Sequence, residues 1–201
     1  MRNKVKIAVL VSGGGTNLQA LIDADERVIK SGRIELVISS NPNAYALRRA
    51  EKAGIPAVTV SRRDAASQAE FEAGISQALA EHGIEMIVLA GFMSILSADF
   101  IKQWPERIIN VHPSLIPSFC GAGFYGLRVH RAALDYGVKV TGATVHYVNE
   151  IPDGGRILLQ KAVEIEADDT PETLQRRVME QAEWIILPQA AELVAERIRK
   201  G

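Results

Sequence analysis

The sequence has little cysteine, no long apolar run and no excess of charge of either sign. Its single cysteine, Cys120, rules out an internal disulfide and suits a reducing compartment. No apolar stretch approaches the roughly 18 residues that a membrane helix needs. Lys and Arg number 23 against 24 Asp and Glu, a net charge of −1, which gives no reason to expect a nucleic-acid or anionic-membrane partner. The apolar start up to Ser12 runs into three glycines rather than a leader cleavage site, so we expect a cytoplasmic protein.

Apolar runs alternate with helix-spaced patterns through the first half of the chain. Strands are expected over residues 5–12, 34–40, 57–60, 86–90 and 108–112. Between them, helices are expected over 17–30, 45–53, from a cap at Asp64 towards His82, and after Ser97. This alternation predicts an α/β fold with a mostly parallel, twisted sheet flanked by helices, Rossmann-like in this half. The 201 residues fit one domain, 1–201, whose first part, 1–112, is an α/β half.

The second part, 113–201, has a different pattern. A loop rich in Pro, Gly and Ser covers 113–126, and a helix follows near 129–136. Strands are expected over 139–148 and 156–164, pairing antiparallel at the sheet edge and joined by the segment 149–155. A long final helix covers 171–198, with Pro188 as a candidate kink.

A glycine-rich turn, Ser12-Gly13-Gly14-Gly15-Thr16-Asn17, joins the first strand to the first helix. Glycines allow close backbone approach, and free N–H groups at a helix start attract an anion. The pattern matches neither G-x-G-x-x-G nor G-x-x-x-x-G-K-[ST]. A phosphate site is therefore favoured over a plain turn, without a dinucleotide or Walker assignment.

Asn110 and His112 stand two residues apart at the end of a predicted strand. Alternate side chains of a strand share a face, so the two project together, at the sheet edge where open α/β sheets place their sites. A histidine can transfer a proton near neutral pH, and an asparagine amide can stabilise an oxyanion. Spacing alone leaves a catalytic pair and a structural histidine equally open.

Asp153 lies in the segment Asn149-Glu150-Ile151-Pro152-Asp153-Gly154-Gly155, which read by itself is a turn between two strands. It gains a function only if the fold brings it to His112, where a carboxylate would stabilise the imidazolium. His146 precedes this turn. His112, His146 and Asp153 also form a conceivable metal set, although three dispersed ligands without a spacing motif make metal the weaker interpretation.

Several motifs together resemble the phosphoribosylglycinamide formyltransferase family. The matching stretches are KIAVLVSGGGTNLQALI, IELVISSNPNAYALRRAEKAGIP, VLAGFMSIL, IINVHPSLIPSF, TGATVHYVNEIPDGGRILLQ and the segment around RVMEQAEWIILP. They span nearly the whole chain in family order, so the combined signal is far more specific than any one motif.

The resemblance implies transfer of a formyl group from 10-formyltetrahydrofolate to the glycine amine of glycinamide ribonucleotide in purine (IMP) biosynthesis, without a metal. It implies that His112 is the proton donor, that Asn110 binds the oxyanion and that Asp153 pairs with His112. The residues implied to bind the ribonucleotide are Gly15, Thr16, Asn17, His146 and Glu183. Those implied to line the folate site are Phe92, Met93, Ser94, Ile95, Leu96, Asn110, Asn149, Glu150, Ile151, Pro152 and Asp153.

The chain departs from the family pattern in three places. The segment 118–127 is longer than the usual loop after the histidine, and Ser94 and Gln68 stand where relatives carry arginines near folate. Which residue makes those contacts here is left open, as is the choice between monomer and homodimer.

Other functions compete with this interpretation. A formyltetrahydrofolate deformylase would share the chemistry but hydrolyse the formyl group, and is expected to carry an extra N-terminal domain. A tRNA formyltransferase is expected to have an extra C-terminal domain and more positive charge. A metal-dependent hydrolase and a non-catalytic nucleotide-binding module are the alternatives from other classes.

Overall fold

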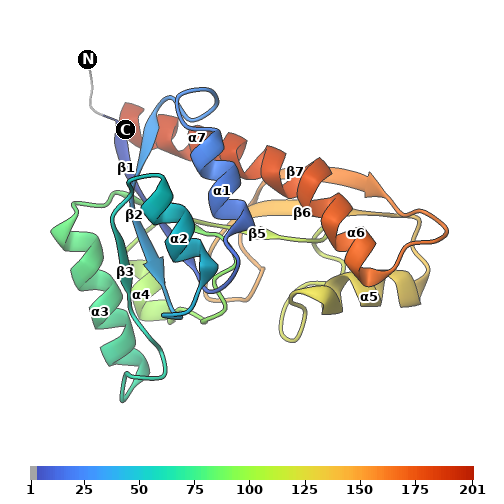
Figure 1. The fold of residues 1–201 in the computed structure, drawn as a ribbon, viewed down its shortest axis with the longest axis horizontal. Coiled ribbons are helices and arrows are strands. Elements are labelled where there is room, and N and C mark those ends of the chain that lie inside the picture. The colour runs from blue at the N-terminus through green and yellow to red at the C-terminus, as the bar shows by residue number, and fades with distance from the viewer. Residues whose placement is uncertain (1–3) are drawn as a thin grey trace.

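The computed structural model describes residues 4–201 and is built on one seven-stranded sheet of order β3-β2-β1-β4-β5-β6-β7 (Figure 1). Strands β1 to β5 are parallel, whereas β6 and β7 run antiparallel to their neighbours. This confirms the mixed α/β fold expected from the sequence. The strands are β1 (Val5–Val11), β2 (Gly32–Ser39), β3 (Ala57–Thr59), β4 (Met86–Leu89), β5 (Ile108–His112), β6 (Val140–Tyr147) and β7 (Ile157–Glu164).

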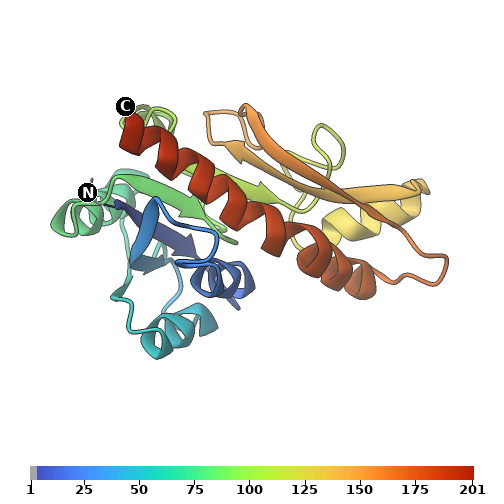
Figure 2. The same ribbon diagram turned by 90° about the horizontal axis from the view of Figure 1, so that it is seen from above.

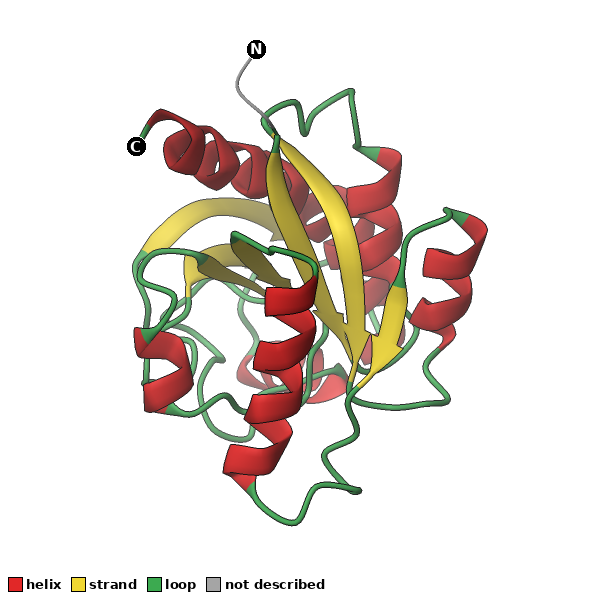
Figure 3. Cartoon of the chain, turned by 90° about the vertical axis from the view of Figure 1, so that its left-hand side faces the viewer, coloured by secondary structure: helices red, strands yellow, loops and turns green. Residues whose placement is uncertain are grey.

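Helices cover both faces of the sheet, as Figure 3 shows in red against yellow. They are α1 (Thr16–Asp23), α2 (Tyr45–Lys52), α3 (Gln68–Glu81), α4 (Ala98–Lys102), α5 (Leu127–Tyr136), α6 (Pro171–Val178), the π-helical turn η1 (Met179–Glu183) and α7 (Trp184–Lys200). Successive side chains of β1 point to opposite faces of the sheet, so the hydrophobic core has two parts. Val9 belongs to the part formed with α1, α2 and α7, and Leu10 belongs to the part formed with α3 and α4. Because both faces are covered, the central parallel strands β1 and β4 are almost entirely apolar.

The parallel strands all end at the same edge of the sheet, and this positions the site. The loops that follow β1, β4 and β5 leave from that edge, and the backbone N–H of Ser12 donates to the carbonyl of Gly91 (3.1 Å). The late strands extend the sheet beyond β5, with α6 and α5 beside them (Figure 1). The glycine-rich turn, the loop after β4 and the end of β5 therefore lie next to one another.

The first helix is shorter than the sequence predicts. It ends at Asp23 instead of Lys30, and a turn with a left-handed residue, Glu26 (φ 61°), follows. The Glu192 carboxylate on α7 accepts the N–H groups of Lys30 and Ser31, both at 2.8 Å. The backbone N–H groups of these two residues are thus bonded to a distant helix, where the sequence pattern had predicted further helical turns.

Two other helix boundaries also differ from expectation. The cap of α3 is Ser67, whose hydroxyl accepts the N–H of Glu70, and Asp64 lies outside the helix. The C-terminal helix is continuous in direction (Figure 2) but contains the π-turn η1 before Pro188, which itself lies within α7. The irregularity thus precedes the proline, and π-turns of this kind are frequent at functional sites.

Among residues 4–201, none of the helices combines the length and the apolar character needed to cross a membrane. The basic first residues, part of the segment considered above as a leader, lie outside the described residues.

Candidate active site

Strands β5 and β6 bring Asn110 and His146 face to face. The antiparallel register pairs Asn110 with His146 and His112 with Thr144. The Asn110 side-chain amide donates to Nε2 of His146 (3.2 Å), and Nδ1 of His146 donates to the carbonyl of Tyr147 (2.8 Å). The second hydrogen of the Asn110 amide remains available for a further acceptor. Asn110 therefore has the donor that an oxyanion requires.

Asp153 reaches both histidines from the turn after β6. Its Oδ2 lies 3.4 Å from Nδ1 of His112, and its Oδ1 lies 3.6 Å from Nε2 of His146. The backbone N–H of Gly121, in the long loop, donates to the same Oδ2 (2.8 Å). The fold thus gathers Asn110, His112 and Asp153, the three candidate catalytic residues, with His146 beside them.

The Asp153 carboxyl is kept ionised by its neighbours. Burial alone would raise its pKa, but the neighbouring His146 ring, the hydrogen bond from the Gly121 N–H and the proximity of His112 lower the pKa below its usual value. A negative charge is therefore held 3.4 Å from Nδ1 of His112.

His112 is buried, with 5% of its surface exposed. Its Nε2 donates to the carbonyl of Phe119 (2.9 Å), and its Nδ1 faces Asp153. Both ring nitrogens therefore face acceptors, an arrangement that suits a doubly protonated imidazole. Phe119 holds that carbonyl in a left-handed backbone conformation (φ 50°).

A hollow of about 590 Å³, open to solvent on one side, lies next to this cluster. Its walls are mostly apolar, with a few polar groups at one end, as is usual for small-molecule sites. The lining residues are Leu89, Phe92, Ser94, Ile95, Leu96, Ile101, Asn110, His146, Val148, Asn149, Glu150, Ile151, Pro152 and Asp153.

Most residues expected to contact folate line this hollow. Met93 does not line it and is 58% exposed. Its backbone N–H donates instead to the Ser12 hydroxyl (2.9 Å). His112 also lies outside the lining, behind Asp153.

The residues expected to bind the ribonucleotide gather at the start of α1. Gly15 has φ 71°, and a Cβ there would lie 2.6 Å from Cβ of Ala46, so this position requires glycine. The Asn17 side chain donates to Oε2 of Glu183 (2.6 Å) within the protein. Burial raises the pKa of Glu183 to about 7, and the bond from Asn17 opposes this only partly.

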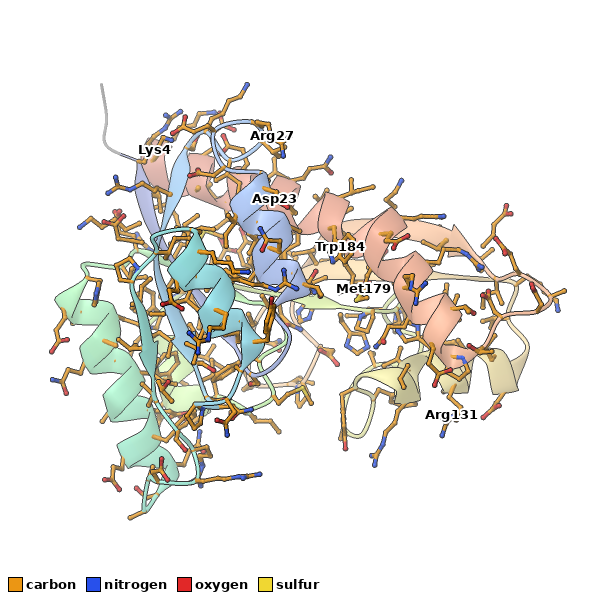
Figure 4. All side chains as sticks on the ribbon, viewed as in Figure 1. Lys4, Asp23, Arg27, Arg131, Met179 and Trp184 are labelled. Carbon is orange, nitrogen blue, oxygen red and sulfur yellow. The ribbon has the colours of Figure 1, made fainter. Side chains whose placement is uncertain are left out.

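The π-turn η1 forms the opposite side of this region. Thr16 donates to the sulfur of Met179 (3.8 Å), and Figure 4 shows Met179 and Trp184 on the C-terminal helices next to α1. The indole N–H of Trp184 and Oδ1 of Asn17 are buried without a protein partner. Met179 and Trp184 carry no chemical signature in sequence, so only the fold reveals their position.

Two further contacts come from backbone groups, the carbonyl of Phe119 and the N–H of Gly121. Neither leaves a trace in residue type, which explains why sequence reasoning did not find them. Within the described part of the chain, no group of three or more His, Cys, Asp or Glu side chains is arranged to hold a metal ion.

The model of the formyl transferase family matches residues 5–191. The trifunctional purine biosynthetic protein adenosine-3 of Gallus gallus is 47% identical over 96% of this chain, and phosphoribosylglycinamide formyltransferase of Haemophilus influenzae is 40% identical over 91% of it. The chain spans 19% of the first of these relatives and 84% of the second.

Solved structures agree with these matches. Glycinamide ribonucleotide transformylase 1 of Symbiobacterium toebii superposes with a TM-score of 0.89 at 40% identity, covering 96% of this chain and 89% of that one. Phosphoribosylglycinamide formyltransferase of Brucella melitensis gives 0.87 at 40% identity, covering 96% of both chains. With a family model matched over most of its length, the chain belongs to the formyl transferase family.

Proposed function

We propose that this protein transfers the formyl group of 10-formyltetrahydrofolate to the glycine amine of glycinamide ribonucleotide. The observation that carries the proposal is the cluster of Asn110, His112, His146 and Asp153 at the polar end of an apolar hollow. The names of the relatives, which are glycinamide ribonucleotide transformylases and their equivalents, support the same reaction.

The two substrates fit the two sides of the site. A flat pterin suits the apolar hollow, whose polar end holds Asn110 and Asp153. The phosphate of the ribonucleotide suits the turn before α1, where free N–H groups and the helix dipole attract an anion. The amine and the formyl carbon would then meet where β5 ends, between the two sites.

The chemistry is direct acyl transfer. The amine nitrogen attacks the formyl carbon, a C–N bond forms, and the carbonyl oxygen becomes an oxyanion. The free hydrogen of the Asn110 amide donates to this oxygen, and the His112 imidazolium adds positive charge. The bond from the formyl carbon to the folate nitrogen then breaks. That nitrogen takes up a proton, and the attacking nitrogen gives one up, so the number of protons is unchanged.

His112 has to change one contact in order to take part. Its Nε2 donates to the Phe119 carbonyl, so the proton is released towards the substrates only when the 118–127 loop withdraws that carbonyl. Asp153 faces Nδ1 throughout and keeps the ring in place. The long loop is therefore part of the proposed catalytic cycle.

The test is to mix the protein with both substrates and follow the appearance of deformylated folate by absorbance. We expect product only when glycinamide ribonucleotide is present. If folate is deformylated equally fast without the ribonucleotide, the protein is a deformylase and the proposal is wrong.

A further inference from the structure

One wall of the apolar hollow is the loop between β4 and α4, residues 91–97, here called the wall loop. It contributes Phe92, Ser94, Ile95 and Leu96 to the lining, and Ile95 is 76% exposed. Leu96 is buried in the core, whereas Ile95 gains little stability from burial. The position of the loop around Ile95 therefore depends on contacts from elsewhere in the fold.

Helix α3 supplies these contacts through Glu72, a buried carboxylate with 8% of its surface exposed. Its Oε1 accepts the backbone N–H of Ser97 (2.5 Å), and its Oε2 accepts the Ser97 hydroxyl (2.6 Å). Ser97 is the N-cap of α4, where the wall loop ends. Glu72 therefore fixes the end of the wall loop with two hydrogen bonds.

Gln68, one turn earlier on α3, extends the same network. Its side-chain nitrogen donates to Oε1 of Glu72 (2.7 Å) and to the carbonyl of Ile95 (2.9 Å). An amide nitrogen has two hydrogens, so both bonds form at once. The position of Ile95 is thus tied to Glu72 through one intervening side chain.

A third contact holds the start of the wall loop. The rings of Phe71 and Phe92 stack with centroids 6.3 Å apart and an interplanar angle of 8°. Three successive points of the loop, Phe92, Ile95 and Ser97, are therefore fixed by one face of α3. Glu72 is central to two of the three, and it does not line the hollow itself.

A carboxylate suits this position because every partner is a donor. An ionised Glu offers acceptors only, whereas a glutamine amide would turn its N–H₂ group to the Ser97 hydroxyl, which would then have to accept and would lose the acceptor of its own hydrogen. The substitution of Glu72 by Gln keeps the size of the side chain and breaks the pattern. A buried donor left without an acceptor is unfavourable, so the wall loop would have to shift.

We propose that Glu72 is a positioning residue for the folate pocket, setting through Ser97 and Gln68 the place of the wall against which the pterin packs. This inference rests on the proposed function, because it takes folate as the occupant of the hollow. In this role Glu72 takes no part in the chemistry, whose groups lie on β5 and in the turn after β6.

The test compares E72Q with E81Q, a matched control on the same helix. Glu81 accepts from Gln77 one turn earlier (2.9 Å), as Glu72 does from Gln68, but it is exposed and lies at the far end of α3. Folate binding is measured by calorimetry, and steady-state kinetics gives kcat and both KM values. We expect E72Q to raise the folate Kd and KM about tenfold or more while kcat and the ribonucleotide KM stay within about twofold. E81Q should match the wild type.

Two results would overturn the inference. One is wild-type folate affinity in folded E72Q, and the other is a loss spread equally over kcat and both KM values, which a merely structural role would give. Should E72Q fail to fold, Q68A removes the link between Glu72 and Ile95 but leaves both bonds from Ser97 to Glu72, and it should raise the folate KM about threefold or more. An unchanged KM would contradict the proposal. Wild-type protein that binds folate but transfers no formyl group would refute the proposed function instead.

Discussion

Replacing Asp153 with Asn removes a charge from the site at almost constant shape. The carboxylate lies 3.4 Å from Nδ1 of His112, and only 14% of its side chain is exposed. With an effective dielectric constant of about 20, a unit pair at that distance interacts by about 5 kcal/mol. The remaining solvent access reduces this figure. Since about 1.4 kcal/mol corresponds to a factor of ten, we expect kcat to fall by about a thousandfold.

The assay is formyl transfer at saturating concentrations of both substrates, together with a denaturation curve to show that the variant is folded. Asp169→Asn is the matched control, because Asp169 is also a paired carboxylate with little side-chain exposure, and neither it nor its partner Arg177 lines the hollow. It should change stability and leave kcat near the wild-type value. A kcat for Asp153→Asn within about tenfold of the wild type would show that the charge beside His112 does not drive the reaction.

Three other changes give equally direct tests. Asn110→Ala should lower kcat about a hundredfold, since one oxyanion donor contributes roughly 3 kcal/mol; an unchanged kcat would contradict that role. Because the pKa of Glu183 rises from 4.5 to about 7 on folding, the folded state retains a proton that the unfolded chain releases. The free energy of unfolding should therefore fall by roughly 3 kcal/mol as pH rises from about 4.5 to 7. Denaturation of Glu183→Gln should lack that slope, and an identical slope would refute the assignment. Gly15→Ala, with its Cβ 2.6 Å from Ala46, should lower the midpoint of thermal unfolding, whereas Gly13→Ala, with nothing within 4 Å, should not; equal midpoints would count against the strain at Gly15.

The fold could be predicted largely from the sequence because its strands are buried on both faces. Met86–Leu89 is a continuous apolar run and Val5–Val11 is one interrupted only by Lys6, patterns that few other structures explain. Helix ends were less predictable. The bonds from Glu192 to Lys30 and Ser31 end the first helical region early, and they join residues more than 160 positions apart. No local pattern contains that information.

The candidate site was predictable where it depends on side chains placed by strand geometry. Asn110 and His112 share a face because they are two residues apart on β5, and their position at a strand end follows from the parallel sheet. The contacts of Phe119 and Gly121 could not be foreseen, since they come from backbone groups of an irregular loop. Residue type carries no record of which carbonyl or N–H a loop will present.

Asp153 shows that a turn and a functional interpretation need not compete. Its backbone is left-handed (φ 55°), a conformation that Asp adopts more readily than most residues, so the Asp-Gly pair is a genuine turn signal. The N–H of Gly154 closes that turn by donating to the carbonyl of Ile151 (2.9 Å). The same reversal directs the carboxylate back to the two histidines. Asn also adopts this turn conformation but has no carboxylate, so it would preserve the fold and lose the charge. Asp153→Asn therefore tests the charge beside the histidines separately from the turn.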